Sequence, residues 1–171
     1  MQICKELAAA GIEQFELFDP GRIDRQAMAH HFRGWKDFGR YKTAIAQEII
    51  LSFNRAANIA TYVFNFDENL VEFKQACQHA DIIVCATEDN TSRVKVNSVA
   101  LLLGKTTIFV RMLRSQVGGE IFRVRADNTN APCFGCLLCT GRFFQDAEEG
   151  MLETQKSGFQ YELAPVISYS T

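Results

Sequence analysis

The sequence lacks the features that mark nucleic-acid-binding, membrane-spanning and secreted proteins. Its 171 residues carry a net charge of only −2, so no basic field would attract nucleic acid. The longest apolar run, residues 99–104, is far shorter than the roughly 20 residues that cross a bilayer. No signal peptide precedes the first helix-like segment, and six cysteines in such a chain indicate thiols or metal ligands rather than disulfides. We therefore expect a cytoplasmic protein that binds neither nucleic acid nor a membrane.

What the sequence does contain is a regular alternation of strand-like and helix-like segments. The apolar run at 81–86 is typical of a parallel strand that is buried on both faces. Alternating strands and helices predict an α/β fold with a Rossmann-like, doubly wound and mostly parallel sheet. Helices are predicted at 2–10, 41–53, 67–80 and 91–104, and strands at 14–19, 58–66, 81–86, 105–113 and 118–126.

The beginning of such a sheet is missing from the sequence. A Rossmann-like unit starts with a strand and a glycine-rich turn that leads into the first helix. This sequence opens within that helix, so we expect a sheet without its first strand. The missing strand would be central, and we interpret the chain as a fragment of a longer protein rather than as a truncated relative.

Two residues in the first half are candidates for binding a nucleotide. Asp19 ends the strand at 14–19, where a carboxylate can accept hydrogen bonds from ribose hydroxyls. Its simpler interpretation is an aspartate that forms a turn before Pro20. Lys42 begins the next predicted helix, where a lysine and backbone amides together make a phosphate contact. The alternative for Lys42 is an ordinary solvated lysine.

A second group of polar residues follows the strand at 81–86. Glu88 and Asp89 lie at the carboxyl end of this strand, where ligands bind in open α/β sheets. Carboxylates there could hold Mg²⁺ beside substrate phosphates, although a capped helix start explains them equally well. Arg93 and Asn97 follow four residues apart, on one face of the next helix.

The stretch "APCFGCLLC" places three cysteines at three-residue intervals: Cys133, Cys136 and Cys139. Read alone, the run is compatible with half of a zinc site, with a redox pair plus a spare thiol, or with coincidence. A structural zinc ion takes four ligands, and this run offers three.

Four segments follow one another in a fixed order: "KELAAAGIEQFELFDP", "GRYKTAIAQEIILSFN", "CATEDNTSRVKVN" and "GGEIFRVRADNTNAPCFGCLL". Together they resemble the ThiF/MoeB/HesA family of ubiquitin-activating-type adenylyltransferases, over roughly residues 5–139. This resemblance implies ATP- and Mg²⁺-dependent adenylation of the C-terminal carboxylate of a ubiquitin-like or sulfur-carrier protein, by a homodimer. It also divides the chain into an adenylation domain at 1–128 and a cysteine-containing crossover loop and tail at 129–171, within the same domain.

The resemblance also implies roles for individual residues. Cys133 and Cys136 would form the first half of a Cys₄ zinc site whose second half comes later in the family. Further roles are ribose binding by Asp19, phosphate binding by Lys42, Mg²⁺ binding by Glu88 or Asp89, and shaping of the nucleotide pocket by Arg93 and Asn97.

The sequence departs from the family pattern at several positions. His30 stands where the family has an arginine that reaches the phosphates, and Arg25 lies about five residues too early, so both are catalytic candidates. Gly21 replaces a second acidic residue, and the family's glycine loop would precede Met1. We therefore expect this chain alone to be inactive. The alternatives are a non-catalytic partner subunit or binding module of the same fold and, less well supported, an NAD-binding Rossmann fragment.

Overall fold

A computed structural model describes residues 1–25, 34–65, 68–87, 90–112, 119–125, 127–128 and 131–139. The chain divides into two compact units, Met1–Ala76 and Cys77–Thr171, and the division falls within helix α4 (Leu70–His79). Among the described residues, no helix is long and apolar enough to cross a membrane.

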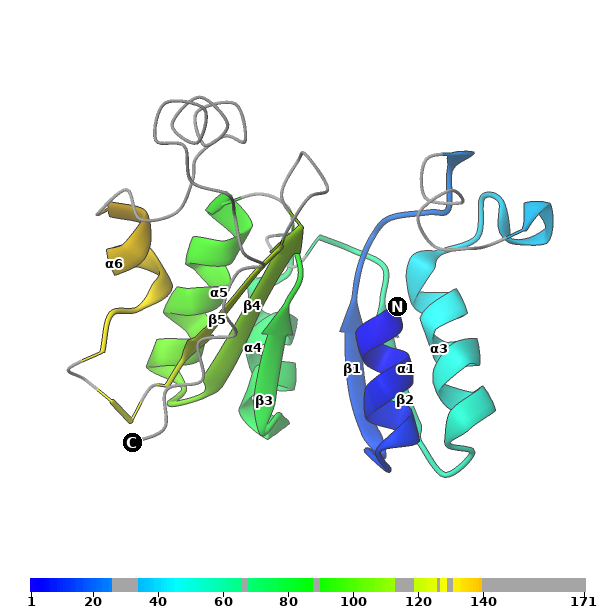
Figure 1. Cartoon of the computed structure of the whole chain (residues 1–171), viewed down its shortest axis with the longest axis horizontal. Helices are drawn as coiled ribbons and strands as arrows, with labels where there is room; N and C mark the ends of the chain where they lie inside the picture. The colour runs from blue at the N-terminus through cyan, green and yellow to red at the C-terminus, as the bar shows by residue number, and fades with distance from the viewer. Residues whose placement is uncertain are drawn as a thin grey trace, which may run out of the picture. The chain divides into compact units, whose positions relative to one another are not determined.

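The first unit is built on two parallel strands. They pair from Gln14 opposite Asn58 to Phe18 opposite Tyr62, and the chain crosses from one strand to the other through a helix. The first two helices pack against each other, as Figure 1 shows in dark blue and cyan. A small apolar core of Ala8, Phe15 and Ile50 joins helices and strands. The elements are α1 (Gln2–Ala9), β1 (Gln14–Phe18), the 3₁₀ turn η1 (Trp35–Asp37), α3 (Lys42–Phe53) and β2 (Asn58–Tyr62).

The second unit contains a three-stranded sheet in the order β3-β4-β5. Its first two strands are parallel and its last two antiparallel, so the sheet is mixed. One face is covered by helices, and on it Phe134 stacks on Phe109 with 4.7 Å between ring centroids. The elements are β3 (Ile82–Cys85), α5 (Asn90–Leu102), β4 (Thr106–Met112), β5 (Gly119–Val124) and α6 (Phe134–Cys139).

Glycines end two of the helices at positions that the sequence predicts. Gly11 follows α1 with φ of +90°, and Gly104 follows α5 with φ of +68°. Only glycine adopts such backbone angles without steric cost, so these two residues stop their helices.

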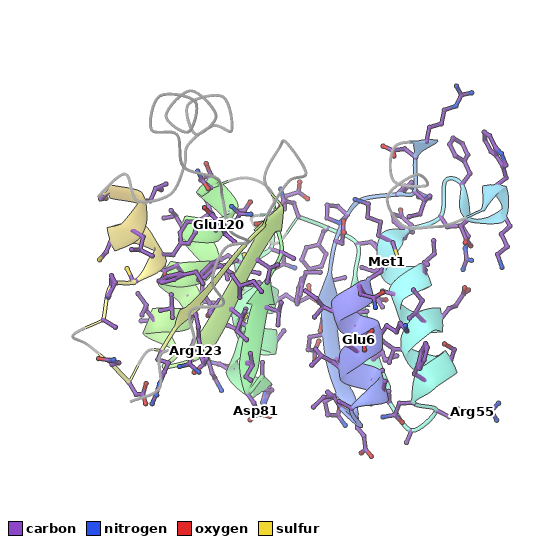
Figure 2. The ribbon with its side chains drawn as sticks, viewed as in Figure 1. Met1, Glu6, Arg55, Asp81, Glu120 and Arg123 are labelled. Atoms are coloured by element: carbon purple, nitrogen blue, oxygen red, sulfur yellow. The ribbon has the colours of Figure 1, made fainter. Side chains whose placement is uncertain are left out.

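The structure confirms the predicted α/β fold and each predicted helix and strand within the described residues, with bounds that shift by up to four residues. Two expectations are wrong. Strand β3 is buried on one face only, because Ile82 is 54% exposed. Strand β5, in which Figure 2 labels Glu120 and Arg123, likewise leaves Ile121 60% exposed. The cysteine run, expected as a loop, begins the short helix α6. Residues 145–155, whose sequence is compatible with a further helix, lie outside the described residues.

Candidate functional site

Asp19 and Lys42 converge on Gly21, where the first strand ends. The Oδ1 atom of Asp19 accepts a hydrogen bond from the Gly21 N–H at 2.7 Å, and the Lys42 N–H donates to the Gly21 carbonyl at 2.9 Å. A Cβ atom on Gly21 would lie 2.7 Å from Asp19 Oδ1 and 3.1 Å from Lys42 Nζ. The structure therefore brings together the two residues that the sequence predicts as ribose and phosphate ligands.

Residues 22–23 pair antiparallel with residues 39–41, and this pairing, called the neck below, closes the loop between β1 and α3. Arg22 and Tyr41 form an isolated β-bridge, and the Arg22 guanidinium lies 3.7 Å from the centroid of the Tyr41 ring. Ile23 donates a backbone hydrogen bond to Arg40 at 2.9 Å, and Gly39 donates one to Ile23 at 2.8 Å. The neck holds the end of β1 against the first turn of α3.

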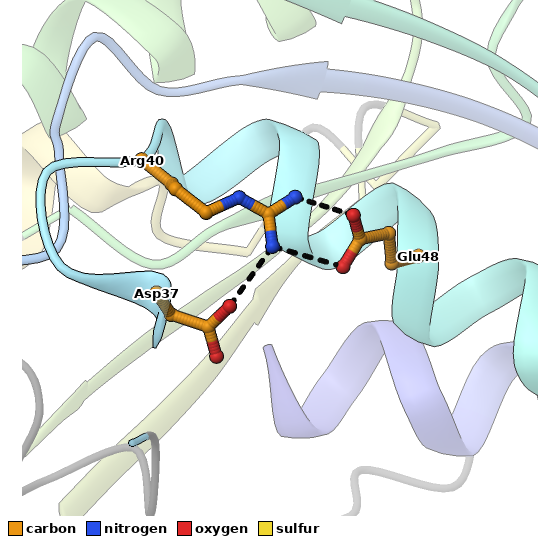
Figure 3. A network of polar contacts seen from close by, with 3 residues as sticks. All are labelled: Asp37, Arg40 and Glu48. Carbon is orange, nitrogen blue, oxygen red and sulfur yellow. Dashed lines mark hydrogen bonds and ion pairs between the residues drawn. The ribbon is translucent and has the colours of Figure 1, made fainter. Parts of the chain in front are cut away.

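An ionic network ties the same loop to α3 (Figure 3). Arg40 Nη1 donates to Asp37 Oδ1 at 2.9 Å and to Glu48 Oε2 at 3.2 Å, while Nη2 donates to Glu48 Oε1. The hydrogen bonds with Glu48, and secondarily with Asp37, raise the pKa of Arg40 above its usual range. Asp37 is only 1% exposed. Sequence reasoning missed this network, because three charged residues in and after a loop look like solvated side chains.

The first turn of α3 completes the site. Its N-cap residue, Tyr41, makes no side-chain hydrogen bond to the first-turn amides. N–H groups at the start of a helix carry partial positive charge and favour an anion. The Lys42 N–H is already bonded to the Gly21 carbonyl, so the later first-turn amides and the Lys42 ammonium form the surface that can bind phosphate beside the Asp19 carboxylate.

Arg93 and Asn97 make buried structural hydrogen bonds inside the second unit. Arg93 is 1% exposed; its guanidinium donates to the Thr87 carbonyl and lies 3.5 Å from Asn90 Oδ1. Asn97 is 4% exposed, and its Oδ1 accepts the Phe134 N–H at 3.1 Å. These contacts hold the start of α5 to the end of β3 and hold α6 to α5. Nucleotide binding by Arg93 and Asn97 stays a prediction.

The remaining predicted catalytic residues are largely outside the described part of the chain. Arg25 is described and is exposed to solvent. His30, Glu88 and Asp89 lie outside the described residues. Their roles in phosphate and Mg²⁺ binding stay predictions.

Two of the three clustered cysteines are in contact. Cys133 Sγ and Cys136 Sγ lie 3.5 Å apart at the start of α6. Burial alone would raise the pKa of the Cys133 thiol, but hydrogen bonds from backbone N–H groups and from Asn97 have the larger combined effect, so the pKa is lowered. Cys139 is exposed. The described residues contain no group of three or more histidine, cysteine, aspartate or glutamate side chains that could hold a metal, so they supply at most two of the four zinc ligands.

Comparisons with known proteins identify the family and the fold. The profile of the ThiF family matches residues 1–168. No curated protein sequence matches the chain. The fold is similar to E. coli MccB crystallised with succinimide, with a TM-score of 0.64 and 16% identity over 92% of this chain and 44% of that one.

Two further solved structures are similar. E. coli MccB with ATP gives a TM-score of 0.61 at 16% identity, over 92% of this chain and 44% of that one. PaaA gives a TM-score of 0.53 at 19% identity, over 63% of this chain and 33% of that one. The chain thus spans less than half the length of these structures, and the likeness concerns the fold.

Proposed function

This chain belongs to the ThiF family, and from that premise we propose that it forms the nucleotide-binding part of an adenylating enzyme. The substrate would be the C-terminal carboxylate of a ubiquitin-like or sulfur-carrier protein. Family membership supports adenylyltransferase chemistry in general. Two similar structures add support, since one holds MccB with ATP and another holds MccB with MccA.

The observation that carries the proposal is the convergence of Asp19 and Lys42 on Gly21. The Asp19 carboxylate would accept hydrogen bonds from the ribose hydroxyls of ATP. Lys42 and the first-turn amides of α3 would hold the phosphates. Because the neck fixes both residues to one backbone segment, ribose and phosphates would be bound at a set spacing.

The reaction needs positioning and charge stabilisation more than acid–base chemistry. A carboxylate oxygen of the carrier protein attacks the α-phosphorus, and the bond from that phosphorus to the pyrophosphate oxygen breaks. The products are an acyl-adenylate and pyrophosphate. Negative charge develops on the phosphate oxygens, and the fixed positive charge of Lys42 would stabilise it.

Other residues of the proposed site rest on the family resemblance. Glu88 or Asp89 would hold Mg²⁺, which neutralises the departing pyrophosphate. Arg25 or His30 would supply a second cation to the phosphates. We also propose the cytoplasm as the compartment, supported by six cysteines none of which is in a disulfide, and a homodimer as the assembly.

The proposed domain spans residues 1–128, with 129–171 as its cysteine-containing loop and tail. Zinc binding by Cys133 and Cys136 stays part of the proposal for the whole protein, and two further ligands would have to come from outside the described residues.

A non-catalytic partner subunit of the same fold is the second candidate. It is favoured by Gly21, which stands where the family has a second acidic residue. The two candidates differ in catalysis rather than in fold.

Binding and exchange assays test the proposal. ATP binding is measured by the fluorescence of Trp35, the chain's single tryptophan, which lies in the loop closed by the neck. Substitution Lys42→Met should weaken ATP binding by roughly tenfold or more, because a charge-assisted hydrogen bond contributes about 1.5–3 kcal/mol. The matched control Lys36→Met removes an exposed lysine from the same loop and should change affinity less than about twofold.

The outcomes separate the candidates. Carrier-dependent ATP–pyrophosphate exchange that disappears in Lys42→Met supports the enzyme. ATP binding without exchange in the whole protein supports the partner subunit. Equal losses of ATP affinity in the two lysine variants would contradict phosphate binding by Lys42.

A further inference from the structure

The 3₁₀ turn η1 and the residue after it present two aromatic rings to solvent. Trp35 is 70% exposed and Phe38 is 51% exposed, and their ring centroids lie 5.8 Å apart. Because a 3₁₀ helix completes a turn in three residues, side chains three positions apart lie on the same face. The two rings therefore form one outward-facing apolar patch, called the aromatic surface below.

The acidic residue between the two rings is buried instead of them. Asp37 is 1% exposed, and its Oδ1 atom accepts a hydrogen bond from Arg40, which also binds Glu48 of α3 (Figure 3). A carboxylate is normally solvated and a large aromatic ring is normally buried, so this turn has the opposite arrangement. A partner that covers the rings would recover the burial that folding of this chain leaves out. Because the ion pairs already hold the turn to α3, such a partner would have little backbone to order.

Cations without a carboxylate partner lie beside the aromatic surface. Lys36 is exposed, and its ammonium has no hydrogen bond or ion pair within the described part of the chain. Arg22 Nη1 donates to the Gly39 carbonyl at 2.7 Å, which brings a second cation to the turn. Residues 19–25 and 34–42 together carry five lysines and arginines against three aspartates, whereas the whole chain has a net charge of −2. This charge favours an acidic partner.

We propose that the aromatic surface and its two cations bind an acidic segment of the carrier protein, an inference that rests on the proposed function. Tryptophan and arginine are the residues that most often dominate the binding energy of protein interfaces. The aromatic surface also belongs to the β1–α3 loop, whose base holds Asp19 and Lys42. A carrier bound there would occupy the same unit as the proposed nucleotide site, which its C-terminal carboxylate must reach.

The opposite end of α3 provides matched controls. Phe53, the last residue of α3, is 51% exposed, the same fraction as Phe38. Arg55, labelled in Figure 2, follows that end of the helix and is exposed, as Lys36 is. Neither control residue belongs to the β1–α3 loop, so the proposal assigns neither of them to the carrier.

Fluorescence of the full wild-type chain is the first test, because Trp35 is its single tryptophan. In the free chain, acrylamide should quench Trp35 nearly as well as it quenches a free tryptophan derivative, at every protein concentration. A short synthetic peptide of alternating glutamate and leucine, with a free C-terminal carboxylate, should protect Trp35 from the quencher. The same peptide with lysine in place of glutamate should not. Added salt should weaken the protection by screening the charges.

Substitutions then locate the binding surface. Phe38→Ala should weaken binding of the acidic peptide by about fivefold or more, because truncated aromatic anchors have effects of this size, whereas Phe53→Ala should change it by less than about twofold. Lys36→Glu should weaken the same binding more than Arg55→Glu does, because it reverses a charge at the turn itself. Calorimetric titration with ATP should give the same affinity in Phe38→Ala, Phe53→Ala and wild type, which also verifies that both variants fold.

Several results would overturn the proposal. Protection of Trp35 in the free chain would show that the chain itself or a second copy covers the aromatic surface. Equal binding of the two peptides, tighter binding of a single-stranded oligonucleotide, or equal losses in Phe38→Ala and Phe53→Ala would also contradict it. ATP affinity keeps the two proposals apart. A wild-type chain that binds the acidic peptide but not ATP contradicts the proposed function, whereas one that binds ATP but not the peptide contradicts the aromatic surface.

Discussion

The two candidate sites are held in place by different forces. At the Asp19–Lys42 site, backbone hydrogen bonds of the neck and the partly exposed ion pairs of Arg40 with Asp37 and Glu48 hold the loop to α3. At the cysteine pair, a buried ring and one buried hydrogen bond do so. A site fixed by surface polar contacts should respond to salt and local substitution, whereas one fixed by burial should fail together with its core.

The largest expected effect comes from removing the buried anchor of the cysteine pair. Phe134→Ala should lower the free energy of unfolding by about 3–5 kcal/mol, because it leaves a cavity beside Phe109. Urea denaturation measures this loss. The control Phe53→Ala removes a half-exposed ring and should cost less than about 1 kcal/mol. Similar losses in both variants would contradict anchoring by burial.

The next effect should separate binding from stability at the nucleotide site. In Gly21→Ala, the added Cβ pushes away the Asp19 carboxylate and the Lys42 ammonium, so ATP affinity should fall roughly tenfold, or about 1.4 kcal/mol. The free energy of unfolding should change by less than about 1 kcal/mol, because the restriction of the unfolded chain by alanine offsets the loss of the Asp19–Gly21 hydrogen bond.

Calorimetric titration with ATP and urea denaturation of the same variant measure both quantities. Gly34→Ala is the matched control, since a Cβ there meets no atom within 4 Å. ATP affinity that is equal in the two glycine variants would show that Asp19 and Lys42 do not bind the nucleotide together.

A smaller effect is expected from the ionic network. Arg40→Met removes the ion pairs with Asp37 and Glu48 and should lower the thermal midpoint by less than Phe134→Ala does. The difference from wild type should shrink in 1 M salt, where charges are screened within about 3 Å. Thermal unfolding at two salt concentrations tests this. A salt-independent difference would indicate that packing of the arginine stem, rather than its charge, matters.

The smallest effect is confined to alkaline pH. The hydrogen bond from Tyr62 to Glu16, together with burial and the charges of Glu16 and Glu72, raises the pKa of Tyr62 to about 12. The neutral phenol therefore contributes stability that is fully present below pH 10, the unfolded value of about 10, and is lost as pH rises through about 12. Thermal unfolding between pH 9 and 12 should show a steeper loss in wild type than in Tyr62→Phe. Parallel curves would contradict this linkage.

The sequence predicts the elements better than the contacts between them. The order of helices and strands follows from local periodicity, and the Asp19–Lys42 pair from their positions at element ends. Helix α6 was not predicted, because Pro132, Gly135 and three cysteines in a short run have the composition of a loop. Strand β3 was predicted to be buried on both faces because its residues are all apolar, but one face is open.

The supporting contacts could not be predicted because they join residues that are distant in sequence. Asn97 and Phe134 are 37 positions apart, and no pattern in either segment indicates that a buried amide receives the N–H of the second. From the sequence, Asp37 would be expected on the surface, because its hydrogen bond with Arg40 is evident only in the structure. Local patterns thus predict which side chains carry the chemistry, whereas tertiary packing determines what holds them.

The neck also lets the β1–α3 connection change in length. Because Arg22 and Tyr41 close the chain at its base, the backbone hydrogen bonds that join the end of β1 to the start of α3 lie outside residues 24–38. Doubling the length of a flexible loop costs only about 0.6 kcal/mol in closure entropy. A change in the length of this segment should therefore leave the contacts of Asp19 and Lys42 in place, provided that Asp37, the partner of Arg40, is kept.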